Sequence, residues 1–285
     1  MSRIIIFGAN GMLGHAVLRV LGENPNYEVI GVVRSESTAR SLSGLSKAQL
    51  VVIDNIDDSN ILDTLFDSLR PDLVVNAVGL VKQFVHSEDP LIAIPINAVF
   101  PHRLAQLCSS SNARLIHIST DCVFSGFKGG YKEDDIPDAR DFYGRSKLLG
   151  EVDYPHAVTL RTSIIGHELV GSHGLVSWFL KQQGDVKGYT RAIFSGLPTC
   201  ELAKIIGDII IPDAKLQGLF HVAANPISKY DLLHMVNREY ARGINIEPDE
   251  HLKIDRSLNA GRFREATGYV APEWPDLIAQ MYKFQ

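Results

Sequence analysis

The sequence predicts an α/β fold in which a doubly wound parallel sheet carries a smaller C-terminal lobe. A continuous apolar run, Ile4–Phe7, is typical of a strand buried on both faces, and a glycine-rich segment follows it directly. Strand-like and helical patterns then alternate through the first 162 residues, as they do in parallel sheets with helices on both faces. We therefore predict a Rossmann-type fold.

The order of the elements follows from short runs of apolar residues and from apolar positions spaced three and four apart. After Ile4–Phe7, further strands are expected at Tyr27–Val33, Gln49–Ile53, Leu73–Asn76, Arg114–Ser119 and Ala157–Arg161. Amphipathic helices are expected between them at Leu13–Leu21, Ile61–Leu69 and Ile96–Ser110. Asp58 or Ser59 is the expected N-cap of the second helix, and Pro71 ends it.

The regular alternation fades in the second half of the chain. Helical stripes remain at Leu202–Ile211 and Tyr230–Tyr240, and a strand-like run lies at Gly218–Ala223. We expect residues 1–162 to form the main domain and residues 163–285 a lobe over the carboxyl ends of the strands, where such sheets bind ligands. The lobe is discontinuous if the strand near residues 218–223 returns to the main sheet.

Composition excludes several classes of protein. The 285 residues carry a net charge of −5 and are 45% hydrophobic, which argues against disorder and against a basic surface for nucleic acid or membrane lipid. The three cysteines, Cys108, Cys122 and Cys200, are far apart and form no CxxC pair, so neither a disulfide framework nor a metal site is expected. The apolar runs are too short to span a bilayer and no leader precedes the first strand, so we expect a cytoplasmic protein.

The segment Gly8-Ala9-Asn10-Gly11-Met12-Leu13-Gly14 joins the first strand to the first helix. Its GxxGxxG spacing suits a dinucleotide: the first glycine permits the turn, the second lets a pyrophosphate approach the backbone, and the third allows close packing of helix and strand. The alternative is a glycine-rich turn without a ligand. The residues expected to contact a cofactor here are Gly8, Asn10, Gly11, Met12, Leu13 and Gly14.

Residues at the ends of the next two strands bear on which dinucleotide binds. Arg34 follows the second strand, where an arginine suits the 2′-phosphate of NADP and a carboxylate would favour NAD. A solvated surface arginine is the alternative. Asn55 and Ile56 follow the third strand and are placed to hold the adenine ring beside Asp54, unless Asp54 only closes the strand. NADPH is therefore the favoured cofactor, with NAD as the alternative.

Tyr143 and Lys147 are four residues apart on a predicted helix, so they share one face. A lysine ammonium there would lower the pKa of the phenol and bind the ribose hydroxyls of a nicotinamide. Thr120 closes the fifth strand, where its hydroxyl would hold a substrate oxygen while Tyr143 delivers a proton. An exposed tyrosine–lysine pair and a strand-end threonine are the ordinary alternatives.

Several motifs occur together with the glycine segment. They are Arg70-Pro71-Asp72, Asn76-Ala77-Val78-Gly79, Ser119-Thr120-Asp121-Cys122-Val123-Phe124, Tyr143-Gly144-Arg145-Ser146-Lys147 and Arg161-Thr162-Ser163. In this combination the chain resembles the extended short-chain dehydrogenase/reductases, and within that family the dTDP-4-dehydrorhamnose reductases. The similarity runs from Arg3 to about Thr162 and continues more weakly through Gly196–Thr199.

The resemblance implies an oxidoreductase that reduces a nucleotide sugar, with the C-terminal lobe binding substrate. It makes Tyr143 the proton donor, Lys147 its tuner and ribose anchor, and Thr120 the partner of the carbonyl oxygen. The implied cofactor contacts after the fourth strand are Ala77, Gly79 and Val81, beside Asn76, and the implied substrate contacts are Lys82, Thr120, Asp121, Phe194 and Pro198. The implied pathway supplies bacterial surface polysaccharides such as O-antigen.

Departures from the family pattern leave alternatives open. Cys122 stands where the family usually has tyrosine, which alters one sugar contact. Sugar-nucleotide dehydratases usually have a glutamate at this position to eliminate water, and a thiol cannot replace that carboxylic acid. An epimerase on the same fold would keep its NAD and return the hydride. A non-catalytic NADP-binding subunit, such as the regulatory subunit of methionine adenosyltransferase, would bind the cofactor without turnover. The expected partners are a nucleotide sugar and a second copy of the chain.

Overall fold

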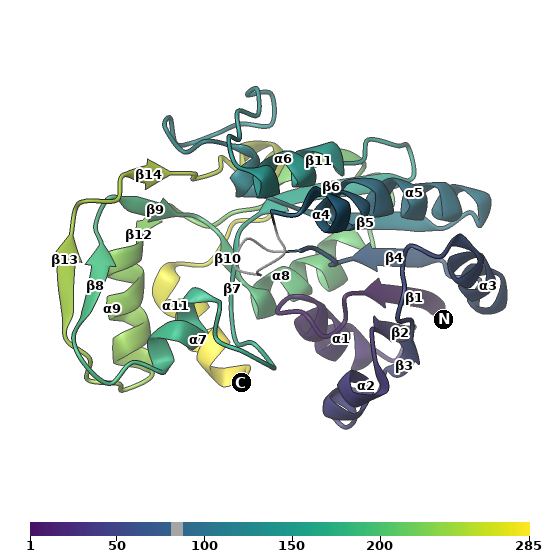
Figure 1. The fold of residues 1–285 in the computed structure, drawn as a ribbon, viewed down its shortest axis with the longest axis horizontal. Helices are drawn as coiled ribbons and strands as arrows, with labels where there is room; N and C mark the ends of the chain where they lie inside the picture. The colour runs from purple at the N-terminus through teal and green to yellow at the C-terminus, as the bar shows by residue number, and fades with distance from the viewer. Residues whose placement is uncertain (81–87) are drawn as a thin grey trace.

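In the computed structural model, which describes residues 1–80 and 88–285, the chain folds around a sheet of seven parallel strands (Figure 1). The order across the sheet is β11-β6-β5-β4-β1-β2-β3. The strands are β1 (Ser2–Phe7), β2 (Tyr27–Val33), β3 (Gln49–Val52), β4 (Leu73–Asn76), β5 (Arg114–Thr120), β6 (Ala157–Thr162) and β11 (Gly218–His221). Because the winding direction reverses between β1 and β4, the sheet is doubly wound, and the predicted Rossmann-type fold is confirmed.

Strand β1 shows why helices cover both faces of the sheet. Ile4 and Ile6 belong to one hydrophobic cluster, and Ile5 and Phe7 belong to a second cluster on the opposite face. The first cluster includes residues of α1 (Gly14–Gly22), α2 (Glu36–Leu42), α8 (Thr199–Ile205) and its π-helical continuation η3 (Ile206–Ile210). The second includes residues of α3 (Ser59–Leu69) and α5 (Phe100–Ser110). The four apolar side chains of β1, Ile4–Phe7, are fully buried, which explains the uninterrupted apolar run.

A long helix, Pro90–Ser110, runs along the second face. It consists of α4 (Pro90–Ile94), the π-helical segment η1 (Pro95–Val99) and α5. The predicted start at Ile96 is wrong: the helix continues through Pro95, whose missing N–H accompanies the switch from α to π geometry. By length and composition this described helix is apolar enough to cross a membrane, contrary to the expectation from apolar runs. However, 44% of its apolar window is buried, and Phe100 and Leu104 pack into the second cluster.

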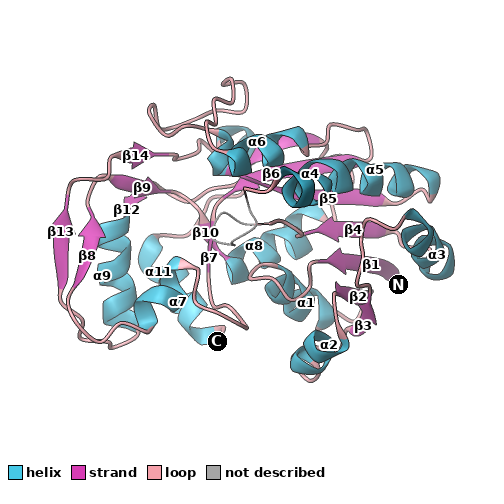
Figure 2. Cartoon of the chain, in the orientation of Figure 1, coloured by secondary structure: helices cyan, strands magenta, loops and turns pink. Residues whose placement is uncertain are grey.

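The C-terminal part builds a lobe of short strands and helices at one end of the sheet (Figure 2). Its small sheets pair β7 (Ile164–Ile165) with β10 (Leu197–Pro198), β9 (Ala192–Phe194) with β12 (Ile227–Ser228) and β14 (Ile254–Asp255), and β8 (Val186–Tyr189) with β13 (Ile246–Asp249). The helices of the lobe are α7 (Leu175–Leu180), α9 (Lys229–Glu239), α10 (Gly261–Thr267) and α11 (Trp274–Lys283). The 3-10 turn η2 (Asp121–Val123) and α6 (Phe142–Leu149) lie in the first part of the chain, between β5 and β6.

The two parts of the chain share one hydrophobic core. Strand β11 leaves the lobe and pairs with β6 of the main sheet. The first cluster extends from β1 and α1 through α8 to α9 and α11 without a break. A domain boundary at residue 162 stays a prediction, since segments on both sides of it build the same sheet and the same core.

A buried ion pair ties β6 to the end of α6. Arg161 donates from Nε and Nη2 to the two carboxylate oxygens of Glu151, each at 2.7 Å, and the two side chains are 4% and 12% exposed. The Ser119 hydroxyl on β5 donates to Glu151 Oε1, also at 2.7 Å. His221 on β11 lies 3.4 Å from Arg161 Nη1, and burial, reinforced by the Arg161 charge, lowers its pKa to about 4. One carboxylate therefore connects α6 with the strands beside it.

Replacing Glu151 tests how much this carboxylate contributes to the free energy of unfolding. Glu151→Ala leaves the Arg161 guanidinium buried without its partner, so the free energy of unfolding should fall by about 3–5 kcal/mol in urea denaturation. The matched control is Glu28→Ala, which breaks the ion pair of Arg3 and Glu28, whose side chains are 34% and 32% exposed. The control should cost about 1 kcal/mol or less. Equal losses in the two variants would show that burial of the pair is unimportant.

Candidate active site

The carboxyl ends of β1 and β4 meet at one edge of the sheet. Phe7 and Asn76 are in register, so the residues that follow them, Gly8 and Ala77, lie next to each other. Gly8 has a φ of +78°, and a Cβ at this position would lie 2.9 Å from the Ala77 carbonyl oxygen. Conformation and space therefore both require glycine at the start of the turn.

The glycine-rich segment folds into a tight turn in front of α1. The Gly11 N–H donates to the Gly8 carbonyl at 2.9 Å, and a Cβ at Gly14 would overlap the same carbonyl group. Any side chain at Gly8 or Gly14 would thus force the turn open. The result is a bare backbone surface at a helix N-terminus, and this cradle fits the pyrophosphate of a dinucleotide.

The other residues predicted in this turn have different surroundings. Asn10 is exposed, whereas Leu13 is buried in the first cluster. Met12 is half-buried, and its methyl group lies against Gly174 of the C-terminal lobe. Only Asn10 and Met12 therefore have side-chain surface in reach of a ligand, and Leu13 could contribute only its backbone.

Arg34, Asn55 and Ile56 gather where β2 and β3 end. The Ile53 N–H donates to the Val33 carbonyl at 2.8 Å, which keeps these strand ends side by side. Arg34 and Asn55 are exposed, and Ile56 packs against the second cluster. The three residues predicted to contact the adenosine therefore lie together at one edge of the sheet, and the Arg34 guanidinium is exposed to solvent.

Asn76 shapes the loop that leaves β4. Its Oδ1 accepts from the Val78 N–H at 3.1 Å, and its Nδ2 lies 3.1 Å from Nδ1 of the fully buried His117. A Cβ at Gly79 would lie 3.9 Å from Lys147 Nζ, so the loop passes close to α6. The predicted contacts Val81 and Lys82 lie outside the described residues.

Lys147 is buried between α6 and the sheet. Its Nζ donates to the Ile118 carbonyl on β5 at 2.8 Å, and only 3% of the residue is exposed. Burial lowers the pKa of Lys147 to about 8, against the opposing effect of the Glu151 charge. The helix is fixed at its start by the Asp141 carboxylate, which accepts from the Gly144 N–H at 2.8 Å.

The Thr120 hydroxyl lies beside the phenol of Tyr143. Burial is the largest influence and raises the pKa of Tyr143, the Cys122 thiol raises it further, and the hydrogen bond with Thr120 lowers it. Thr120 Oγ1 also accepts from the Cys122 N–H at 3.1 Å and donates to Asp121 Oδ1 at 3.2 Å. The structure therefore brings Thr120, Tyr143 and Lys147 together at the end of β5, with the phenol in its protonated form.

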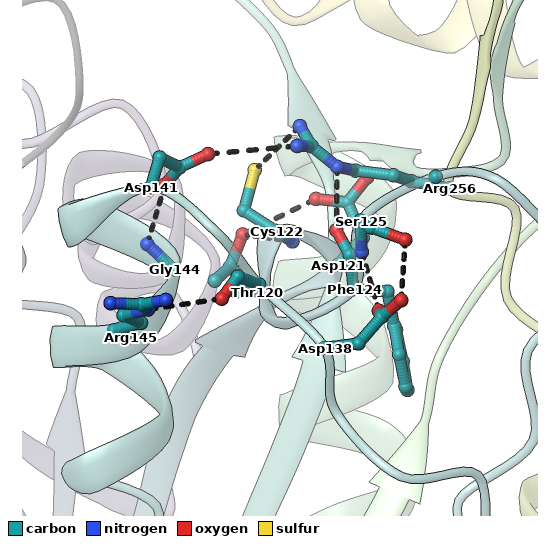
Figure 3. Close-up of polar contacts among 12 residues, drawn as sticks. Thr120, Asp121, Cys122, Phe124, Ser125, Asp138, Asp141, Gly144, Arg145 and Arg256 are labelled. Atoms are coloured by element: carbon teal, nitrogen blue, oxygen red, sulfur yellow. Dashed lines mark hydrogen bonds and ion pairs between the residues drawn. The ribbon is translucent and has the colours of Figure 1, made fainter.

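A charged residue of the C-terminal lobe reaches the turn that follows Thr120 (Figure 3). Arg256, just after β14, donates from Nε to the Phe124 carbonyl at 2.8 Å. Burial raises the pKa of Asp121, while the charges of Arg256 and Lys229 lower it. Arg256 and Lys229 were not predicted from the sequence, because no local pattern links them to Thr120 and only the three-dimensional path of the chain brings them close.

Phe194 and Pro198 are buried in the C-terminal lobe. The Phe194 ring packs against the Trp274 ring, with centroids 5.8 Å apart, and Pro198 belongs to β10. In the described structure both side chains support the core of the lobe. Their contact with a nucleotide stays a prediction.

Comparison with known proteins identifies relatives that span most of the chain. A dTDP-4-dehydrorhamnose reductase of Aggregatibacter actinomycetemcomitans is 28% identical over 242 residues, which cover 81% of this chain and 76% of the relative. A probable low-salt glycan biosynthesis reductase of Haloferax volcanii is 31% identical over 230 residues, covering 77% and 73%. The beta subunit of methionine adenosyltransferase 2 of Bos taurus is 31% identical over 149 residues, covering only 52% and 41%.

Solved structures share the whole fold. A dTDP-4-dehydrorhamnose reductase of Bacillus anthracis in complex with NADP superposes with a TM-score of 0.80 at 21% identity, covering 100% of this chain and 98% of that one. The corresponding enzyme of Clostridium acetobutylicum gives a TM-score of 0.81 at 24% identity, covering 99% and 98%. At these identities the likeness establishes the fold alone.

The two reductase relatives confirm the predicted class, an oxidoreductase of the extended short-chain dehydrogenase/reductase type. A family model described as the RmlD substrate binding domain matches residues 2–262. That match covers both the glycine-rich turn and the Thr120–Tyr143–Lys147 group, and the chain therefore belongs to the RmlD substrate binding domain family.

Proposed function

We propose that the protein is an NADPH-dependent reductase of a nucleoside-diphosphate 4-keto-6-deoxy sugar. The observation that carries this proposal is the convergence of Thr120, Tyr143 and Lys147 at the end of β5, beside the loop of Gly79. Two relatives with reductase names, each aligned over more than two thirds of its length, support the reaction type.

The residues present fit a nicotinamide dinucleotide. The bare turn of Gly8 and Gly14 receives the pyrophosphate, and Lys147, close to Gly79, is placed to meet a ribose hydroxyl. When bound, NADPH supplies the hydride that reduces the keto carbon. Tyr143 donates the proton that the new alkoxide oxygen needs, and Thr120 holds that oxygen by a hydrogen bond. The ketone thus becomes an alcohol, and the phenol is reprotonated from solvent.

The choice of NADPH over NADH rests on Arg34. Its guanidinium is exposed at the end of β2, with no carboxylate in the position that would favour the ribose of NAD. The NADP complex of the related Bacillus anthracis reductase supports this assignment. NAD stays the alternative.

The sugar is expected between the β5 end and the lobe formed by residues 163–285, with Asp121 as one contact. The names of the two reductase relatives support glycan precursor synthesis as the pathway. Cytoplasmic location and a homodimer belong to the same proposal.

A regulatory subunit is the second candidate. The partial match to a methionine adenosyltransferase beta subunit favours it, since that relative is 31% identical to this chain over 149 aligned residues. Such a protein would bind NADP(H), fail to oxidise it with any keto sugar, and co-purify with a stoichiometric partner.

Removal of the proton donor tests the proposed reaction. Tyr143→Phe keeps the ring but loses the acid, so NADPH oxidation with a 4-keto-6-deoxy sugar nucleotide should fall by about 10²–10⁴ while NADPH affinity is retained. Lys147→Met should lower both turnover and NADPH affinity, because it also removes the ribose contact. The double variant should lose less than the product of the single effects. Full turnover by Tyr143→Phe would show that the proton comes from elsewhere.

Cofactor preference can be tested at Arg34. A guanidinium–phosphate contact is worth about 1.5–3 kcal/mol, so Arg34→Ala should weaken NADPH binding roughly ten- to hundredfold and leave NADH binding unchanged. Fluorescence titration with both cofactors measures this. Arg40→Ala, another exposed arginine that lies on α2, is the control. Equal affinities of the parent for both cofactors would contradict the assignment.

The burial of Lys147 predicts a shifted titration in the cofactor-free protein. Its ammonium should lose its proton near pH 8 rather than at the ordinary value of 10.5, as followed by NMR of the labelled lysine side chain and assigned with Lys147→Met. Between these pH values only the unfolded chain keeps the proton. The parent should therefore gain stability relative to Lys147→Met as the pH rises from 8 to 10.5. A midpoint near 10.5 would contradict the burial.

A further inference from the structure

Arg256 is fixed in place by its inner nitrogen. Its Nε donates to the Phe124 carbonyl at 2.8 Å, and the side chain is 19% exposed. The C-terminal lobe thereby directs a guanidinium at the turn that carries Thr120 and Cys122 (Figure 3).

The two outer nitrogens of the same guanidinium lie beside weak or distant acceptors. Nη1 is 3.5 Å from Cys122 Sγ, and sulfur is a poor acceptor. Nη2 is 3.6 Å from Asp141 Oδ2, beyond the usual length of a hydrogen bond. The other Asp141 oxygen already accepts from the Gly144 N–H. A mostly buried arginine thus presents a fork whose donors are incompletely used, and a fork of this kind suits ligand oxygen atoms.

Cys122 is what leaves room for this fork. The thiol already lies 3.5 Å from Nη1, so the larger tyrosine usual in the resembled reductases would displace the guanidinium. Burial, reinforced by Asp121, raises the pKa of the thiol to about 12, so it stays a neutral neighbour of the arginine. The position of Arg256 therefore depends on a cysteine at residue 122, where the family usually has tyrosine.

The position of the fork points to the sugar rather than to the nucleotide. The Cys122 N–H donates to Thr120 Oγ1 at 3.1 Å, and the Cys122 thiol contacts Arg256 Nη1. Cys122 therefore touches both the Arg256 guanidinium and the hydroxyl that we assign to the keto oxygen. On a 4-keto-6-deoxy sugar the ring carbons C2 and C3 carry hydroxyl or acylamino groups, whereas C5 carries the C6 methyl. The carbonyl of an acylamino group is the better match, because it offers two lone pairs and no competing donor.

We propose that Arg256 is a specificity-determining residue that binds the carbonyl oxygen of an acylamino substituent on the sugar of the substrate. This inference rests on the proposed function, since it requires a nucleotide sugar at the end of β5. It narrows the substrate class from keto sugars in general to acylamino keto sugars.

Equilibrium binding tests the proposal without turnover. The probes are a nucleoside diphosphate alone, its glucose ester and its N-acetylglucosamine ester, each as uridine and thymidine forms, titrated calorimetrically into the protein saturated with NADP. The parent should bind the acetamido sugar at least about tenfold more tightly than glucose. Arg256→Gln and Cys122→Tyr should both abolish that preference and leave affinity for the bare diphosphate unchanged.

Control variants separate binding from folding. Arg262→Gln removes a nearby, 42% exposed arginine that pairs with Asp134 on the surface, and it should keep the preference. Unchanged NADP affinity shows that Arg256→Gln is folded, and Arg256→Lys, which keeps the charge without the fork, should recover only part of the preference.

Four results would overturn the proposal. An equal loss of affinity of Arg256→Gln for the bare diphosphate and both sugar nucleotides would show that Arg256 binds the diphosphate. Unchanged affinities in Arg256→Gln would show that Arg256 only links the lobe to Phe124. A parent that binds both sugars well without preferring the acetamido group would refute the specificity but leave the reductase intact. A parent that binds no sugar nucleotide would instead refute the proposed function, and the inference with it.

Discussion

The geometry of the site depends on the buried pair of Glu151 and Arg161. Two charges removed from water are stable only when their hydrogen bonds are complete, and here the carboxylate accepts twice from Arg161 and once from Ser119. Glu151 lies two residues after the end of α6, and Ser119 directly precedes Thr120 on β5. The pair therefore fixes the helix that carries Tyr143 against the strand that carries Thr120. Since a displacement of about 1 Å can cost a hundredfold in rate, this support matters for any chemistry at the strand end.

The fold could be predicted because local patterns of apolar residues indicate most of its strands and helices. The uninterrupted apolar run of β1 reflects burial on both faces, and the helical stripe of α3 begins after the expected N-cap Asp58, whose carboxylate accepts from the Asn60 N–H. The group of Thr120, Tyr143 and Lys147 was also accessible, because strand ends and helix faces follow from spacing alone. Neither α2 nor the start of the long helix at Pro90 was predicted, since α2 is polar and prolines within a helix normally argue against one.

The features that could not be predicted from the sequence depend on contacts between residues far apart in the chain. Arg256 lies 134 positions from Cys122, and no local pattern links the two residues. The buried state of Lys147, and with it the pKa near 8, depends on packing against the Ile118 carbonyl. Phe194, which the resemblance assigns to the substrate, packs against Trp274, and its contact with a nucleotide stays a prediction. Core and binding-site aromatics cannot be told apart by residue type.

The central claim is that this site delivers a hydride to a keto sugar while Tyr143 supplies the proton. The most direct measurement is deuterium transfer from NADPH labelled at C4 of the nicotinamide, in two preparations, one for each face. The 4-keto-6-deoxy sugar nucleotide is the acceptor and mass spectrometry of the product is the readout. The account predicts one deuterium at the newly formed carbinol carbon with one preparation and none with the other. A product without deuterium from either preparation, or NADPH bound but never oxidised, would contradict it.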